Sequence, residues 1–189
     1  MSTKKILLPA IALFAICLVA TLLLALTNQV TKERIDTIAR ESENAARSAV
    51  FPEAATFSDE KTVSAYTYYE ALDGSGNTIG YTFTTSAKGY GGDVSVMTGV
   101  RRDGTVRAIE ILDVSDETPG LGQNAKQDKF KDQFADKQGE IGVSTASKSA
   151  ENGIDALTGA TYTSRGVTDA VNLALKLFAQ IPKGGSANG

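Results

Sequence analysis

The chain opens with a long apolar stretch that contains no charged residue. Ile6 to Leu26 comprises 21 uncharged residues and follows Lys4 and Lys5. A helix of that length spans roughly 30 Å, the thickness of the hydrocarbon core of a bilayer. A cleaved signal peptide would have an apolar region of about 7–15 residues, and a pilin-like stalk would carry a charged residue early in its helix. The pattern therefore predicts a transmembrane helix over residues 6–26, preceded by a short cytoplasmic tail over residues 1–5.

A helical pattern continues beyond the apolar stretch. Residues 27–50 contain neither glycine nor proline, and Val30, Ile38 and Ala45 can share one stripe of a helix. Phe51-Pro52 should end this helix, because the residue before a proline is disfavoured in the α region. We interpret residues 27–61 as a connector helix and loop. A simple stalk and a device that holds the next domain near the membrane both remain open.

From Thr62 onward the pattern changes to alternating apolar and polar residues, which is typical of strands. Segments rich in tyrosine, valine and threonine are separated by glycine-containing turns, and Asp103-Gly104 is a strong hairpin signal. The predicted antiparallel strands cover residues 64–72, 78–86, 93–101 and 105–114.

Helical spacing returns after the strands. Residues 125–134 should form a helix with Phe130 and Phe134 in the core, and the polar residues 136–153 should form a loop. A last helix is predicted over residues 164–180, with its apolar stripe formed by Val167, Val171, Leu175 and Phe178. The fold class is therefore α+β, in which residues 62–182 form an antiparallel-sheet domain with flanking helices. Residues 183–189 are predicted to be a disordered tail.

The segment that leads into the last helix is unusually rich in hydroxyl groups. The hydroxyl side chains are Thr158, Thr161, Thr163 and Ser164, and Gly159 and Ala160 leave the backbone bare beside them. One helix cap needs only one hydroxyl. A turn of this kind also offers free N–H groups and a positive dipole end, which suit a phosphate. Helix capping and phosphate binding are both open from these residues alone.

Two glycine-rich loops carry further candidate groups. Lys88-Gly89-Tyr90-Gly91-Gly92 can be a tight turn, or a bare loop whose tyrosine packs beside a flat ring. The second loop, residues 115–122, combines Pro119 and two glycines with the hydrogen-bonding side chains of Glu117 and Thr118. A ring with imide and carbonyl edges needs such groups in a mostly apolar slot.

Composition removes several classes of function. The chain of 189 residues contains no histidine, no tryptophan and one cysteine. It therefore cannot build a zinc finger, an iron–sulfur cluster, a c-type haem site or a Ser-His-Asp triad, and we predict no catalytic residue and no metal site. The part of the chain after the apolar stretch contains 17 basic residues, which are all 19 except Lys4 and Lys5, and all 22 acidic residues. Its net charge of −5 argues against binding nucleic acid. If the protein transfers electrons, it must therefore do so with an organic cofactor.

The hydroxyl-rich segment resembles a flavin-attachment motif. It is similar to that of the FMN-binding domain family to which the G subunit of the Rnf complex and the C subunit of the sodium-pumping NADH:quinone oxidoreductase belong. The family pattern is Asp, two or three residues, then Ser/Thr-Gly-Ala-Thr, and its last threonine carries FMN through a phosphodiester. Asp155 and Thr158-Gly159-Ala160-Thr161 match it, with threonine at a position that is often serine. Glu-Thr-Pro-Gly-Leu-Gly and Lys-Gly-Tyr-Gly loops also recur in the family, and the short chain favours the Rnf protein.

The resemblance implies covalent FMN on Thr161. The residues it implies for cofactor binding are Thr161, Thr158, Gly159, Ala160, Thr163, Ser164, Glu117, Thr118, Gly120, Leu121, Gly122, Tyr90 and Asp155. It implies an electron-carrying subunit, not catalytic alone, of an ion-translocating ferredoxin:NAD oxidoreductase complex. Its partners would be the other membrane subunits and a flavin transferase, and the phosphoester link would make it a phosphoprotein.

The resemblance also implies a single-pass protein of the inner membrane whose FMN domain is extracytoplasmic. The charges alone leave the orientation undecided, because Lys4 and Lys5 before the span are matched by Lys32, Arg34 and Arg40 after it. The alternative from another class is a membrane-anchored extracytoplasmic binding or assembly domain without a redox role.

Overall fold

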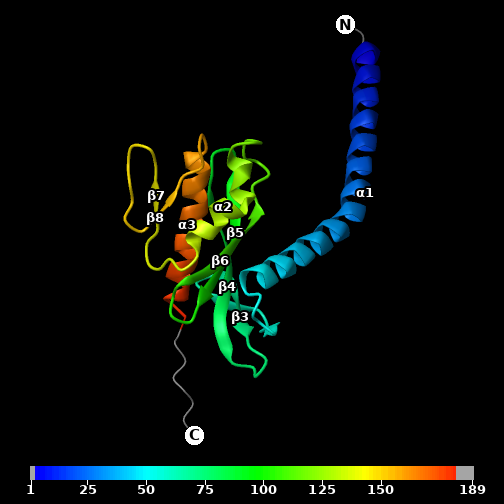
Figure 1. Cartoon of the computed structure of the whole chain (residues 1–189). Coiled ribbons are helices and arrows are strands. Elements are labelled where there is room, and N and C mark those ends of the chain that lie inside the picture. The colour runs from blue at the N-terminus through cyan, green and yellow to red at the C-terminus, as the bar shows by residue number, and fades with distance from the viewer. Residues whose placement is uncertain (1–2, 182–189) are drawn as a thin grey trace. The chain divides into compact units, whose positions relative to one another are not determined.

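The computed structural model describes residues 3–181, and the chain divides into two units at Ser42 and Glu43 (Figure 1). Helix α1, Thr3–Val50, contains residues 3–5 of the predicted tail, the predicted span and the predicted connector helix. It ends directly before Phe51-Pro52, as the proline predicts. Its stretch from Pro9 to Gln29 is long and apolar enough to cross a membrane. The predicted tail at residues 183–189 lies outside the described residues.

The second unit is built on an antiparallel sheet. Its strands are β1 Thr56–Phe57, β2 Lys61–Val63, β3 Tyr66–Leu72, β4 Thr78–Lys88, β5 Asp93–Arg101 and β6 Val106–Asp113. The strand order is β1-β3-β4-β5-β6, and β2 also pairs with β3. The four predicted strands are confirmed to within two residues at every end. The sequence did not predict β1 and β2, because strands of two and three residues are too short to show an alternating pattern.

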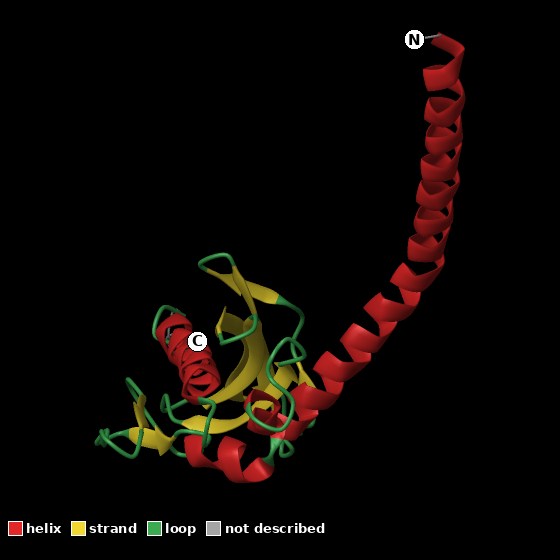
Figure 2. Cartoon of the chain, turned by 90° about the horizontal axis from the view of Figure 1, so that it is seen from above, coloured by secondary structure: helices red, strands yellow, loops and turns green. Residues whose placement is uncertain are grey.

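Alternate residues of the sheet pack against different helices. Helix α3, Thr161–Phe178, contacts β4 and β5 and contributes Val167 and Val171 to the larger core (Figure 2). The opposite face receives the last turn of α1, where Val50 and Phe51 pack with Met97 in a smaller core. The sheet is therefore covered on both faces, and α3 lies against β4 and β5.

The segment between the sheet and α3 departs from the prediction. The single helix expected over residues 125–134 is wrong: the structure has η1 Gly122–Lys126, α2 Asp128–Lys131 and η2 Asp132–Phe134. The break lies at Gln127, whose backbone is extended with φ −72° and ψ 138°. Phe130 and Phe134 are nevertheless buried in the core, as predicted.

Two more boundaries differ. The predicted loop over residues 136–153 contains β7 Gly142–Ser144, which pairs in parallel with β8 Gly153–Asp155. Helix α3 begins at Thr161, three residues earlier than predicted, so the last three hydroxyl residues of the motif lie in its first turn. This shift matters for the site, because it places Thr161 at the helix N-terminus.

Candidate functional site

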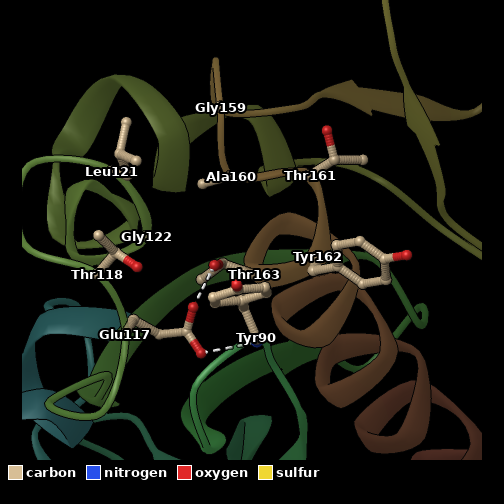
Figure 3. A pocket seen from close by; sticks show the side chains of 10 residues that line it. All are labelled: Tyr90, Glu117, Thr118, Leu121, Gly122, Gly159, Ala160, Thr161, Tyr162 and Thr163. Carbon is tan, nitrogen blue, oxygen red and sulfur yellow. Dashed lines mark hydrogen bonds between the residues drawn. The ribbon is translucent and has the colours of Figure 1, made fainter.

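A cavity of about 300 Å³ lies at the start of α3 (Figure 3). Its lining comes from three segments that are distant in sequence: Tyr90; Glu117, Thr118, Leu121 and Gly122; and Gly159, Ala160, Thr161, Tyr162 and Thr163. The fold therefore brings together nine of the thirteen residues that the sequence singled out. The other four lie elsewhere, and Tyr162 is an addition.

The first turn of α3 is open to a ligand. The N-cap residue is Ala160, which has no side chain that could cap the helix, and the first turn contains no acidic residue. The backbone N–H groups at this end are therefore without a side-chain cap, and the helix dipole places partial positive charge there. This end of α3 suits an anion better than a capped helix would.

The four hydroxyl groups of the motif have separate roles. Thr163 is buried and donates a short hydrogen bond to Oε2 of Glu117. Ser164 is buried as well; its hydroxyl donates to the carbonyl of Ala160 and accepts from the N–H of Leu157. Within residues 3–181, the hydroxyls of Thr158 and Thr161 have no hydrogen-bond partner. The Thr161 hydroxyl points away from the Glu117–Thr163 pair (Figure 3).

Glu117 connects its own loop to the loop of Tyr90 and to the first turn of α3. It is only 2% exposed, and its Oε1 accepts hydrogen bonds from the N–H groups of Tyr90 at 2.8 Å and Gly91 at 3.0 Å. Burial alone would raise the pKa of this carboxyl group. The hydrogen bonds from Thr163 and from the amides of residues 90–92 outweigh burial and lower the pKa of Glu117 below its usual value. Glu117 is therefore a buried carboxylate that stays ionised.

The glycines around Glu117 allow its close contacts. A Cβ on Gly122 would lie 2.6 Å from Oγ1 of Thr163 and 2.7 Å from Oε2 of Glu117. A Cβ on Gly89 would overlap Oε1 of Glu117, and one on Gly91 would overlap the carbonyl oxygen of Asp116. These glycines are thus required by the packing of the protein's own loops, beyond any need of a ligand.

Three other side chains of the lining are exposed and carry rings or an apolar group. Tyr90 is 71% exposed, Tyr162 is 64% exposed and Leu121 is 42% exposed. The two tyrosine rings lie 6.3 Å apart between centroids, with an interplanar angle of 47°. Sequence reasoning missed Tyr162, because the residue falls outside the apolar stripe of α3. The sequence signal that could have identified Tyr162 as a site residue is its position directly after Thr161.

The remaining predicted residues lie outside the cavity. Asp155 and Thr158 line a separate hollow of about 520 Å³ with Asn124, Gln127 and Gln133. The side chain of Gln133 holds the backbone of Asp155, accepting from its N–H at 2.7 Å and donating to its carbonyl at 3.4 Å. Gly120 has a φ of +76° and forms the turn of its loop, and Ser164 is fully engaged in the turn before α3.

Comparison with protein families gives two matches. Residues 89–176 match the FMN-binding domain, and residues 1–50 match the RnfG N-terminal region. The FMN-binding match begins one residue before Tyr90 and extends past Thr163. It therefore contains every residue that lines the cavity at the start of α3.

Several characterised proteins are similar to the chain. The G subunit of the Na⁺-translocating ferredoxin:NAD⁺ oxidoreductase complex of Acetobacterium woodii is 34% identical, with 90% of each chain covered. The G subunit of the ion-translocating oxidoreductase complex of Methanosarcina acetivorans is 30% identical, with 92% of this chain and 94% of that one covered. Both similarities therefore extend over nearly the whole chain, including the apolar N-terminal helix.

Two solved structures have the same fold as the second unit of the chain. The C subunit of the Na⁺-translocating NADH-quinone reductase of Parabacteroides distasonis superposes with a TM-score of 0.54 at 22% identity, covering 64% of each chain. NqrC of Shewanella oneidensis superposes with a TM-score of 0.52 at 21% identity, covering 68% of each chain. At these identities the likeness shows a shared fold.

Proposed function

Since the chain belongs to the RnfG family, we propose that it carries FMN covalently on Thr161 as a membrane-anchored electron-transfer subunit of an ion-translocating ferredoxin:NAD oxidoreductase complex. The other membrane subunits of that complex are its partners. Of the relatives that match nearly the whole chain, the one from Acetobacterium woodii is the G subunit of a Na⁺-translocating ferredoxin:NAD⁺ oxidoreductase complex. The one from Methanosarcina acetivorans is the G subunit of an ion-translocating oxidoreductase complex. The FMN-binding match over residues 89–176 supports the cofactor.

The proposal that FMN is attached at Thr161 rests on the position of the Thr161 hydroxyl and on its lack of a hydrogen-bond partner among residues 3–181. This hydroxyl lines the cavity at the open N-terminus of α3 and has no hydrogen-bond partner within the described residues. Thr163 is a poorer candidate, because its hydroxyl is buried and donates to Glu117. Thr158 lines the neighbouring hollow. Thr161 is therefore the motif hydroxyl that combines access with a place for a phosphate beside it.

The residues around Thr161 fit the two ends of FMN. The uncapped N–H groups of α3 suit the phosphate, and the exposed side chains of Tyr90, Leu121 and Tyr162 suit a flat apolar ring. Thr118 adds a hydroxyl group to the lining of the cavity. FMN would accept electrons and pass them on, and the protein residues would bind it, orient it and set its surroundings.

Glu117 acts on the flavin through its charge. Both of its oxygens already accept hydrogen bonds from the protein, from two amides and from Thr163. A fixed negative charge lining the cavity disfavours additional negative charge on a reduced ring, and so lowers the flavin potential. The same hydrogen bonds hold the loop of Tyr90 against α3, so that Glu117 also positions the ring's apolar contacts.

Attachment needs a second protein. The Thr161 oxygen would form a bond to the phosphorus of FMN in an activated flavin nucleotide while the phosphoanhydride P–O bond of that donor breaks. The rest of the donor would leave as a phosphate, and the hydroxyl proton would pass to a base of the transferase. We propose that a flavin transferase supplies that donor and catalyses the step, since the chain has no histidine and no predicted catalytic group near Thr161.

The attachment is tested on a denaturing gel. When the chain is produced together with a flavin transferase, a fluorescent flavin band should migrate with the wild-type polypeptide. The rival function, an assembly or binding domain without a redox role, predicts a band that stains for protein and never fluoresces. Fluorescence that disappears on denaturation would indicate FMN bound without a covalent link.

The membrane topology is a separate part of the proposal. The apolar stretch from Pro9 to Gln29 fits a single-pass subunit of the inner membrane, and we propose that the FMN domain lies on the extracytoplasmic side. Carbonate extraction should leave the protein in the membrane pellet, and a label attached at Gly189 should react from outside the cytoplasm. Release at high pH would contradict the span, and protection of the label in intact cells would contradict the orientation.

A further inference from the structure

We propose that Arg165 binds the phosphodiester that links FMN to Thr161. This inference rests on the proposed function and adds a residue that the attachment motif does not contain. Arg165 lies in α3 four residues after Thr161. Residues four apart are neighbours on one face of a helix, with about 5–6 Å between their Cβ atoms.

The side chain of Arg165 leans toward the start of the helix. Helical side chains point back toward the N-terminus and cover the preceding turn. The contact in the structure is consistent with this direction, because the guanidinium carbon of Arg165 lies 5.9 Å from the ring centroid of Tyr162, three residues earlier. Arg165 therefore lies on the same side of α3 as the Tyr162 ring, and Thr161 is its neighbour at the i−4 position.

Arg165 is available for an anion. It is exposed, and within residues 3–181 it makes no ion pair and no hydrogen bond. By contrast, Arg107 pairs with Glu53 at 2.8 Å and Arg101 pairs with Asp136 at 2.6 Å. The nearest acidic residue along the helix, Asp169, stands one turn later but forms no ion pair with Arg165. A base that precedes its acid by four residues is the less favourable order in a helix.

The chemistry of a phosphodiester matches this free group. The guanidinium offers five N–H donors in a planar fork, which can bind two phosphate oxygens at once. The uncapped amides of the first turn provide further donors to the same anion. Glu117 does not compete for Arg165, since its carboxylate is occupied by Tyr90, Gly91 and Thr163. Arg165 thus supplies the formal positive charge, and the amides supply the partial charge.

The test uses the full chain with its flavin attached and reads the phosphorus directly. Phosphorus-31 NMR should give one phosphodiester resonance for wild type, which Arg165→Gln displaces and Arg165→Lys partly restores, since lysine keeps the charge and loses the fork. The matched control is Arg102→Gln, which removes the same charge from the exposed β5–β6 turn. Gly104 in that turn approaches Phe178 at the far end of α3, so the control should leave the resonance in place.

Each outcome has a separate meaning. Because Arg165 is exposed, its replacement should leave the midpoint of thermal unfolding within about 2 °C of wild type, and a displaced resonance then reports a local contact. A resonance that is identical in Arg165→Gln, Arg102→Gln and wild type would overturn the role of Arg165 while leaving the covalent flavin intact. A wild-type protein without any phosphodiester resonance would instead refute the proposed function.

Discussion

The floor of the Thr161 cavity, formed by Glu117, Gly122 and Thr163, is buried and fully hydrogen-bonded. Its rim is formed by the half-buried Thr161 and by the exposed side chains of Tyr162, Leu121 and Tyr90. The floor has the packing of a structural core, with glycines wherever a Cβ would collide. The rim leaves a hydroxyl, aromatic rings and helix N–H groups unused.

The contrast separates two functions of the site residues: shaping the site and contacting a ligand. Residues of the floor satisfy one another, so they shape the site whether or not a cofactor is attached. Of the rim side chains, the Thr161 hydroxyl has no hydrogen-bond partner within the described residues, and the exposed rings of Tyr90 and Tyr162 contact mainly each other. Substitutions in the floor should therefore change stability first and flavin properties second, whereas substitutions in the rim should change flavin content or mobility with little cost in stability.

The largest expected effect comes from the two threonines on either side of this boundary. Thr161→Val should abolish covalent flavin completely and leave stability near wild type, because the lost hydroxyl has no protein partner within the described residues. Thr163→Val should keep the flavin and lower the free energy of unfolding by roughly 1–3 kcal/mol, since a buried carboxylate loses a donor. Gel fluorescence and denaturant unfolding measure the two effects. Flavin retained in the Thr161 variant and lost in the Thr163 variant would reverse the assignment.

Removing the carboxylate from the floor should be the most destabilising single change. Glu117→Ala leaves the N–H groups of Tyr90 and Gly91 and the Thr163 hydroxyl without their acceptor, at a cost of roughly 2–4 kcal/mol. Tyr162→Ala is the rim counterpart and should cost about 0.5 kcal/mol or less. Urea unfolding of both variants checks this pair, and equal losses would remove the distinction between floor and rim.

A milder change isolates the charge of the floor from its shape. Glu117→Gln keeps an oxygen that can accept from the Tyr90 and Gly91 amides, while its amide group can donate to the Thr163 oxygen. We expect FMN still attached at Thr161 and a flavin midpoint potential shifted upward, because a negative charge has been removed. Redox titration of the variant beside wild type gives the answer. Coincident titration curves would place Glu117 too far from the ring to influence it.

The smallest effect is a pH dependence of stability. The pKa of Glu117 is lowered in the folded state relative to its ordinary value of 4.5. The ionised form therefore contributes stability that is fully present above the unfolded pKa and is lost as pH falls through the folded pKa. Wild type should lose more stability than Glu117→Gln between neutral and acidic pH. Parallel stability curves for the two proteins would show that Glu117 contributes no such dependence.

Local patterns in the sequence predicted most of the scaffold. Alternation and the Asp103-Gly104 turn placed the four long strands, and helical spacing placed Val167 and Val171 in the core. The short strands β7 and β8 were missed because three residues show no period. The predicted helix over residues 125–134 breaks at Gln127, whose extended backbone has no signal such as glycine or proline.

The candidate site was predictable only in part, for a different reason. The motif drew attention to Thr161, and the loop signature drew attention to Glu117. The role of Glu117 as the tie between loops depends on partners 27 residues before it and 46 residues after it, which no local pattern shows. Tyr162 and Arg165 face away from the apolar stripe of α3, so periodicity treated them as ordinary surface residues.

The most direct test of the central claim is the mass of the intact chain, followed by mapping of the modified peptide. For wild type produced with a flavin transferase, the account predicts a mass increased by that of FMN less one water. Fragmentation should place the increase on Thr161, and Thr161→Val should show the unmodified mass. An unmodified wild-type chain, or an increase located on Thr158, Thr163 or Ser164, would contradict it.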